Sequence, residues 1–322
     1  MRRLAYQTVV ALVAAAPLIS AAQSAYPSRQ IRYIVPQAAG GSSDTLSRAL
    51  APRLADALGQ QVVVDNRPGA TGNIGTELVV RAAPDGYTLL QAATSLATNV
   101  AMQPSAKIDP LRDLAPVILL SQQPNLWAVH PSLPVKSMRE LIAFAKARPG
   151  QVDYATSGTG GSQHLSGELL KVMTGADIVH IPYKGSPPAL IDVLGGRVAV
   201  TVSTLAPAMP HVRDGRLRAL AVTGEQRSVA APTVPTVAES GVPGYAATAW
   251  QGVLAPAGTP REVIARVNAE INKALRLPEV QKFLVDEGYV IEGGTSERYT
   301  AFIKSEIAKW SKVTKAAGLN KP

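Results

Sequence analysis

The chain has 322 residues and no cysteine, which excludes both a disulfide framework and thiolate metal ligands. Aromatic residues make up only 5% of the chain and the basic residues are scattered, so a stacking surface for nucleic acid is not expected. The four histidines lack the spacing of a metal site, and the HExxH motif is missing. We therefore expect no nucleic-acid partner, no metal and no cofactor.

Long apolar runs are also scarce. The run from Val9 to Ile19 is shorter than the ~18 apolar residues of a membrane span, and no later segment supplies one. It follows Arg2 and Arg3 and precedes small residues, which is typical of an export signal. We predict a signal peptide over residues 1–25, removed to leave a soluble periplasmic protein. Without Arg2 and Arg3 the chain has 30 basic and 23 acidic residues, a net charge of +7 that favours anionic ligands.

The chain does contain an alternation of short apolar strands and amphipathic helices. Leu46, Leu50, Leu54 and Leu58, for example, have the spacing of one helix face. This rhythm is typical of a parallel sheet covered by helices. The predicted strands are residues 31–35, 62–64, 87–91, 152–155, 178–181, 198–202 and 217–222, and the predicted helices are residues 45–58, 74–83, 137–147, 165–174, 187–194, 260–275, 278–287 and 296–316.

The rhythm restarts after residue 134, and the length of the chain suits two ordinary domains. We predict two α/β lobes, with lobe 1 formed by residues 26–125 and 250–322 and lobe 2 by residues 126–249. The final helices are expected to return to lobe 1.

Three helix starts carry local signals. Asp44 is placed to cap the first helix, and Ser137 with Glu140 three residues later fits a capping box. Pro187 is predicted at the first position of its helix.

Two glycine-rich turns share one design. The first glycine turn, residues 38–44, reads AAGGSSD, and the second glycine turn, residues 157–162, reads SGTGGS. Each follows an apolar strand and opens a helix, so each places hydroxyls and free backbone N–H groups at a helix start, where the partial charge is positive. We predict that both turns face one cleft and hold an anion from two sides. The alternative is that the glycines only permit tight corners.

Enzyme motifs are incomplete. The second glycine turn lacks the third glycine of GxGxxG, and GxxxxGK[ST] does not occur, so nucleotide binding is not supported. Ser162 lies at a strand-to-helix corner, like a hydrolase nucleophile, but His164 stands where the GxSxG motif requires glycine. We therefore expect a protein that is not an enzyme, with a secreted serine hydrolase using Ser162 as an alternative.

At the two glycine turns and at several other segments, the chain resembles the Bug family, the periplasmic solute-binding proteins of tripartite tricarboxylate transporters. The resemblance implies the type II periplasmic binding protein fold, in which two α/β lobes close over a ligand in the cleft between them. It also implies a small organic carboxylate ligand, integral-membrane transporter subunits as partners, and a monomer. A ligand-dependent sensing receptor for a sensor kinase is the alternative. The similar segments are Ile34–Pro36, Ala39–Asp44, Asp65–Ala70, Gly72–Gly75, Ala83–Leu89, Ser162–Leu165, Pro182–Gly185 and Leu254–Pro260.

The resemblance further implies that both glycine turns contact the carboxylate. Three positions depart from the family pattern: Gln37 replaces a common phenylalanine, Pro187 a frequent glycine, and Ser203–Thr204 an Asp–Asn pair. Without that aspartate to receive an ammonium group, a di- or tricarboxylate or an aromatic acid is favoured over an amino acid. The candidate ligand-binding residues are Gln37, Gly40, Gly41, Ser42, Ser43, Ser95, Ser157, Gly160, Gly161, Ser162, His164, Ser203 and Thr204.

Overall fold

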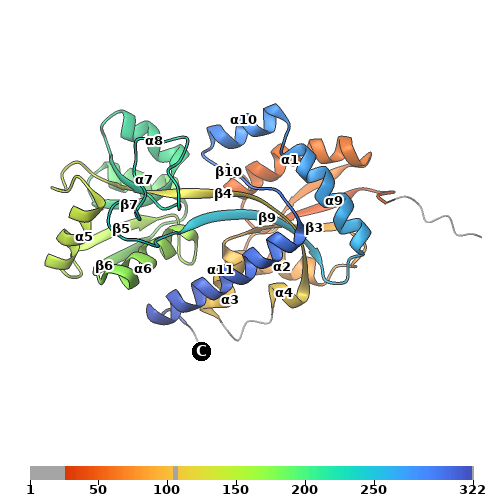
Figure 1. Ribbon diagram of the computed structural model, residues 1–322, viewed down its shortest axis with the longest axis horizontal. Coiled ribbons are helices and arrows are strands. Elements are labelled where there is room, and N and C mark those ends of the chain that lie inside the picture. Colours follow the sequence, from red (N-terminus) through yellow and green to blue (C-terminus); the bar gives the residue numbers. More distant parts are fainter. Residues whose placement is uncertain (1–25, 104–107, 321–322) are drawn as a thin grey trace, which may run out of the picture.

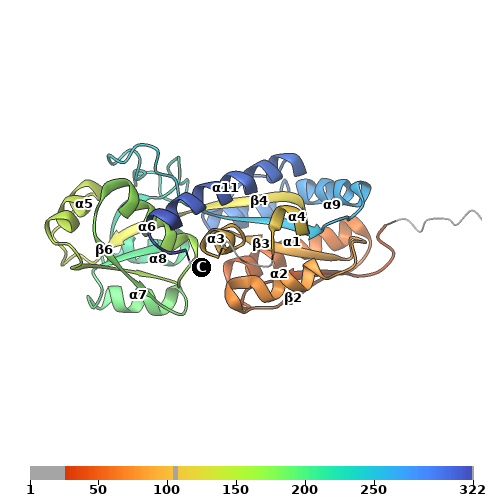
Figure 2. The same ribbon diagram turned by 90° about the horizontal axis from the view of Figure 1, so that it is seen from below.

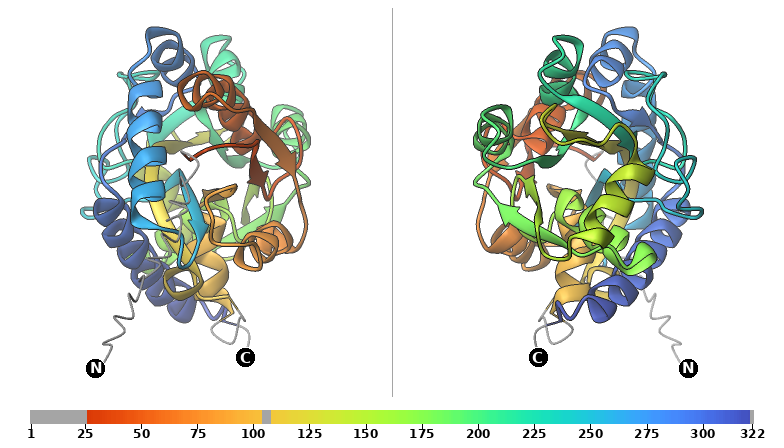
Figure 3. Two further views of the ribbon diagram at one scale, coloured as in Figure 1. Left: turned by 90° about the vertical axis from the view of Figure 1, so that its right-hand side faces the viewer. Right: turned by 90° about the vertical axis from the view of Figure 1, so that its left-hand side faces the viewer.

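The computed structural model describes residues 26–103 and 108–320, so the predicted signal peptide of residues 1–25 lies outside the described residues. Figure 1 shows an elongated molecule with helices and strands gathered at two ends and two long strands running between them. Seen along the long axis, helices surround the strands (Figure 3). The α/β class that the strand and helix pattern predicts is confirmed.

The strands form a mixed sheet in the order β2-β1-β3-β9-β4-β7-β5-β6, and β8 and β10 pair with β4 outside this path. β1 is parallel to β2 and β3, and β5 is parallel to β6 and β7, as expected where helices connect the strands. β4 and β9 are antiparallel to their neighbours. The strands are β1 (Ile31–Val35), β2 (Val62–Asn66), β3 (Thr88–Ala93), β4 (Leu114–Val129), β5 (Val152–Thr156), β6 (Ile178–Pro182), β7 (Val200–Thr204), β8 (Arg218–Val222), β9 (Thr248–Pro256) and β10 (Val290–Ile291).

The longest strand, β4, belongs to two parts of this sheet. Its residues 114–124 pair with β9, whereas residues 125–129 pair with β7 on one side and residues 126–129 pair with β8 on the other. We call the part that contains β1, β2, β3, β9 and β10 the first half-sheet, and the part that contains β5, β6, β7 and β8 the second half-sheet. Since the change of partner falls between Pro124 and Asn125, one unbroken strand positions both half-sheets.

Helices connect and cover the strands. None of those within residues 26–103 and 108–320 has the length and apolar character needed to cross a membrane. The helices are α1 (Ser42–Leu58), the 3₁₀ turn η1 (Ala70–Gly72), α2 (Asn73–Val80), α3 (Ser95–Met102), α4 (Pro110–Asp113), α5 (Met138–Ala147), α6 (Ser162–Thr174), α7 (Ser186–Leu194), α8 (Leu205–Arg213), α9 (Arg261–Ala274), α10 (Pro278–Asp286) and α11 (Ser296–Ala316).

Seven of these elements are not predicted by the sequence pattern: the short elements η1, α4 and β10, and the longer elements α3, α8, β4 and β9. Within β4, Pro116 and Pro124 read as strand breakers, but the pairing of β4 is irregular next to Pro116 and changes partner after Pro124. Helices α3 and α8 follow Thr94 and Thr204, and neither threonine side chain caps its helix. These helices therefore begin without a side-chain cap.

Two local predictions can be checked against the helix starts. The Ser137 hydroxyl accepts the Glu140 N–H at 3.2 Å, so the predicted cap of α5 is confirmed. Helix α7 begins at Ser186 with Gly185 as its N-cap, so Pro187 is its second residue and not its first.

One hydrophobic cluster passes through both half-sheets. It contains fully buried side chains from β3 (Leu90), α6 (Leu165) and α11 (Trp310). Helix α11 is tied to β9 by the buried carboxylate of Glu306, which accepts N–H groups from Trp250 at 3.0 Å and from Trp310 at 2.9 Å. Figure 2 shows α11 running beside β4 toward α6. The C-terminal helix therefore packs against both ends of the molecule.

A second cluster lies beneath α1. Leu46 and Leu50 of α1 pack with Val267 and Ile271 of α9 and with Leu284 of α10. Figure 1 shows these three helices side by side over the first half-sheet. The final helices thus return to the N-terminal part of the chain, as expected.

We expect Trp310→Ala to lower the free energy of unfolding by about 3–5 kcal/mol, because it removes a fully buried ring shared by both half-sheets and an N–H donor to Glu306. Urea denaturation of a chain of residues 26–322 measures this loss. Lys312→Ala, at an exposed position of the same helix, should change the value by less than about 0.5 kcal/mol. A loss below about 1 kcal/mol for Trp310→Ala would contradict the bridging role of α11.

Candidate functional site

The two glycine turns have the same backbone shape. Gly40 has a φ of 79° and Gly160 a φ of 81°, and both lie in the left-handed region that favours glycine. The next residue of each turn is the N-cap of its helix, with φ and ψ of −77° and 167° at Gly41 and of −81° and 172° at Gly161. The prediction that Asp44 caps α1 is therefore wrong, because the helix starts two residues earlier at Ser42.

The third residue of each helix reaches back to the first glycine of its turn. Asp44 Oδ2 accepts the Gly40 N–H at 2.8 Å, and His164 Nδ1 accepts the Gly160 N–H at 3.1 Å. Asp44 also pairs with Arg48 Nε at 3.0 Å. Burial alone raises the pKa of the Asp44 carboxyl, but hydrogen bonds from Arg48 and Gly40 outweigh it, and the pKa is lowered. The equivalent positions thus carry an ionised carboxylate in one turn and an imidazole in the other.

The helix starts keep free backbone donors. The first hydrogen bond inside α1 runs from the Thr45 N–H to the Gly41 carbonyl, and the first inside α6 from the Leu165 N–H to the Gly161 carbonyl. The backbone N–H groups of residues 42–44 and 162–164 therefore have no acceptor within their helices. Neither N-cap glycine offers a side chain to satisfy them. Each helix start therefore presents N–H groups, partial positive charge and a serine hydroxyl, the features of an anion site.

The candidate residues differ in exposure. Those that solvent reaches can contact a ligand directly, whereas the buried ones act through neighbouring groups. Gly40 and Ser42 are exposed; Gln37, Gly41, Ser95, Ser157, Gly161, Ser162 and Thr204 are half-buried; Ser43, Gly160, His164 and Ser203 are buried.

Several candidates lie together where the half-sheets meet. Thr98 of α3 donates its hydroxyl to the Gly160 carbonyl at 2.8 Å, so the second glycine turn contacts the helix that starts at Ser95. Thr204, at the end of β7, pairs with Asn125, where β4 changes partner. Among the described residues no hydrogen bond joins the two glycine turns directly.

The loop before α2 is strained. Ala70 and Thr71 have φ of 45° and 54°, which is rare for residues with a Cβ and rarest for a β-branched one. Asn99 of α3 holds the loop by donating to the Thr71 carbonyl at 3.1 Å. Thr71 also approaches the second glycine turn, since a Cβ placed on Gly160 would lie 3.9 Å from Thr71 Cγ2. Such strain is concentrated at functional sites, and the sequence pattern, which predicts only a loop here, does not reveal it.

A buried polar network lies beneath the first glycine turn. Tyr33 donates to Gln91, Gln91 Nε2 donates to Gln251 Oε1 at 2.7 Å, and Gln251 Nε2 donates to the Tyr289 hydroxyl at 3.1 Å. Tyr289 in turn donates to the Ser42 carbonyl at 3.4 Å. Burial raises the pKa of Tyr289 to about 12, so the hydroxyl keeps its proton. This network fixes the start of α1 to β1, β3 and β9.

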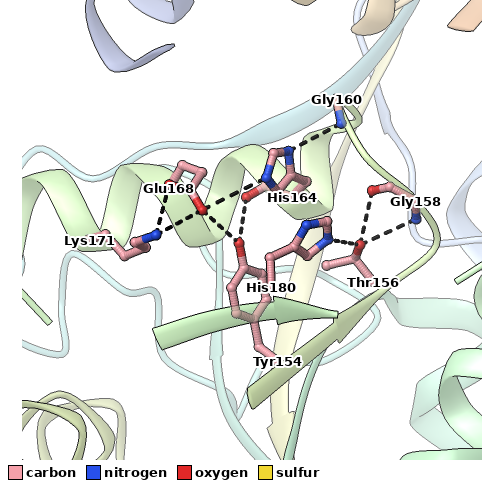
Figure 4. Close-up of polar contacts among 8 residues, drawn as sticks. All are labelled: Tyr154, Thr156, Gly158, Gly160, His164, Glu168, Lys171 and His180. Atoms are coloured by element: carbon pink, nitrogen blue, oxygen red, sulfur yellow. Dashed lines mark hydrogen bonds and ion pairs between the residues drawn. The ribbon is translucent and has the colours of Figure 1, made fainter. Parts of the chain in front are cut away.

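Two stacked histidines lie beneath the second glycine turn (Figure 4). The rings of His164 and His180 are 4.0 Å apart at an interplanar angle of 28°. His180 Nε2 lies 2.7 Å from the Thr156 hydroxyl, and the Thr156 hydroxyl donates to the Gly158 carbonyl at 3.0 Å. Burial lowers the pKa of both histidines, for His180 to about 3. The rings are therefore neutral at pH 7.

The arrangement of His164 near Ser162 differs from that of a base beside a hydrolase nucleophile. His164 Nδ1 accepts the Gly160 N–H and Nε2 faces Glu168 Oε1 at 3.8 Å, so neither nitrogen is left to activate the Ser162 hydroxyl. Within residues 26–103 and 108–320, no three His, Asp or Glu side chains come together to hold a metal ion.

Comparison with known proteins agrees with this geometry. Residues 46–319 match the family described as the tripartite tricarboxylate transporter family receptor. The chain belongs to this family. It is 42% identical to the protein BugT of Bordetella pertussis, over 91% of this chain and 90% of that protein.

Solved structures of receptors similar to this one have the same fold. The Rpa4515 protein of R. palustris, solved with adipate, is 39% identical with a TM-score of 0.81, over 91% of this chain and 98% of that one. The MatC protein of Rhodopseudomonas palustris, with bound malate, is 30% identical with a TM-score of 0.78, over 89% of this chain and 99% of that one. The predicted periplasmic binding protein fold is confirmed.

We expect Thr71→Gly to raise the free energy of unfolding by about 0.5–1 kcal/mol, because the relief of a positive φ exceeds the entropy that glycine adds to the unfolded chain. Thr300→Gly, inside the helical backbone of α11, should lower it instead. Chemical denaturation compares the two variants. An equal decrease in the free energy of unfolding of both variants would show that the loop is not strained.

Proposed function

We propose that this chain is a periplasmic receptor that captures a small organic carboxylate and delivers it to the integral-membrane subunits of a tripartite tricarboxylate transporter. The observation that carries the proposal is the pair of glycine turns. Both have the same backbone shape, and both leave uncapped helix N–H groups beside an accessible serine hydroxyl. Relatives with bound adipate and malate support a carboxylate as the ligand.

In this proposal the ligand lies between two lobes. Lobe 1 comprises residues 26–125 and 250–322 and lobe 2 residues 126–249, boundaries supported by the change of partner in β4 after Pro124. Each lobe contributes one glycine turn. Closure over the ligand excludes water, which strengthens the hydrogen bonds from both turns.

The proposed direct contacts come from accessible groups. Ser42 and Ser162 offer hydroxyls beside the free helix N–H groups, and Ser95, Ser157 and Thr204 add hydroxyls around them. These donors carry no formal charge, and the cation that contacts the first turn, Arg48, is paired with Asp44. Neutral donors allow both capture and release of the ligand. A plain organic acid suits this set better than an amino acid, which needs an acceptor for its ammonium group.

Calorimetry with adipate and malate tests the ligand class. We expect at least one of them to bind and to raise the melting temperature, because a ligand bound only by the folded chain stabilises it. Putrescine, a cation of similar length to adipate, should have no effect. If putrescine binds and neither acid does, the chain is not a carboxylate receptor.

Removal of one serine hydroxyl from each turn tests the contacts. We expect Ser42→Ala and Ser162→Ala each to weaken binding of the better acid by about tenfold, since a hydrogen bond to a charged group contributes about 1.5–3 kcal/mol. Ser305→Ala on α11, where the hydroxyl bonds only its own helix, is the control and should keep the parent affinity. Unchanged affinity in both turn variants would remove the hydroxyls from the site.

A further inference from the structure

We propose that His164 is the positioning residue of the second glycine turn, and that it holds the turn only as a neutral imidazole, so that acid opens this turn but not the first. The inference deepens the proposed function, and only its effect on affinity rests on that function. His164 is 3% exposed and acts through the Gly160 backbone.

The hydrogen bond to Gly160 fixes the tautomer of His164. Because Nδ1 accepts a backbone N–H, the proton of the neutral ring must lie on Nε2. A second proton can only be added at Nδ1, where it would point at the N–H of Gly160. Protonation therefore removes the acceptor and sets two donors against each other.

The ring of His180, stacked on His164, positions Gly158 at the start of the second glycine turn. The Thr156 hydroxyl donates its one proton to the Gly158 carbonyl, so His180 Nε2 is the donor to Thr156. His164 thus holds Gly160 directly, and His180 holds Gly158 through Thr156. A charge on either ring would face the other at 4.0 Å.

The charged and titratable groups around His164 come from three strands or helices and one loop. Glu168 and Lys171 lie on α6 itself, with Lys171 Nζ 3.2 Å from Glu168 Oε2. Tyr154 of β5 donates to Glu168 Oε1 at 3.2 Å, His180 comes from β6, and Tyr245 lies near Tyr154. Burial lowers the pKa of His164; Glu168 acts in the opposite direction and Lys171 adds to the lowering. The Glu168 carboxylate also pairs with Lys171 and accepts the Tyr154 hydroxyl, so it does not offset the burial of His164. His164 therefore does not take a second proton while the turn is closed.

The sign of the pH effect follows from this exclusion. When the turn opens, His164 meets water and takes a pKa near the ordinary value of about 6.5. Below that pH the open form binds a proton that the closed form does not, so opening becomes more favourable by up to about tenfold per pH unit. The first glycine turn behaves differently, because Asp44 has a lowered pKa and stays ionised at pH 5. Gly40 therefore provides an internal control for Gly160.

Solvent-exchange NMR of the backbone amides in a ligand-free chain of residues 26–322 tests the proposal. After correction for intrinsic exchange rates, we expect the protection of the Gly160 N–H to fall at least tenfold between pH 7.0 and 5.0. The protection of the Gly40 N–H should stay within about twofold. Unchanged protection at Gly160, or an equal fall at both glycines, would overturn the proposal.

Two variants separate His164 from general acid effects. His164→Asn places a non-titrating oxygen at the position of Nδ1, so the pH dependence at Gly160 should disappear. His130→Asn changes a histidine that contacts Ser132 instead, and should keep the parent behaviour. If His164→Asn does not fold, the ¹⁵N shifts of the parent imidazole decide, since a proton on Nδ1 at pH 7.0 would overturn the proposal.

Adipate affinity measured at both pH values adds the link to function. The ratio of the affinities at pH 7.0 and 5.0 should be at least threefold larger in the parent chain than in His164→Asn, and protonation of adipate itself affects both equally. Equal ratios would show that the turn does not control binding. Absence of adipate binding at pH 7.0 would count against this ligand for the proposed receptor and would leave the exchange result as the decisive test of His164.

Discussion

The backbone pairing of the continuous strand β4 holds the two half-sheets in one molecule. The first part of β4 is paired with β9 and its last part with β7 and β8, so neither half-sheet can move away without breaking this pairing. Helix α11 adds a second connection through Trp310 and the carboxylate of Glu306.

The two glycine turns use different side chains to accept the same backbone N–H group. A left-handed glycine leaves an N–H that the helix cannot satisfy, and the third helix residue accepts it in both turns. Asp44 does so as a carboxylate neutralised by Arg48, whereas His164 does so as a buried neutral ring. The backbone donors presented to a ligand are therefore alike, but the chemistry behind them is not. Of these two side chains, only the imidazole of His164 has an ordinary pKa near neutral pH, and burial lowers that pKa in the folded chain.

Much of this arrangement rests on buried polar groups and on strain. The chain of hydrogen bonds from Tyr33 to Tyr289 ends on the Ser42 carbonyl, so three strands position the start of α1. Thr71 keeps its positive φ because Asn99 and the adjoining glycines hold the loop. A fully satisfied polar network defines one arrangement of the backbone more sharply than apolar packing alone does.

Local patterns in the sequence determined the α/β class, most of the helices, the cap at Ser137 and both glycine turns, because each depends on residues close together in the chain. Tertiary structure decided the rest. The sequence could not predict β4, since Pro116 and Pro124 look like breakers until the irregular pairing and change of partner are known. It also could not show that Ser42 is exposed while His164 is buried, that Gln251 supports α1, or that Thr71 is strained. Those properties arise from contacts between distant segments, which no local spacing records.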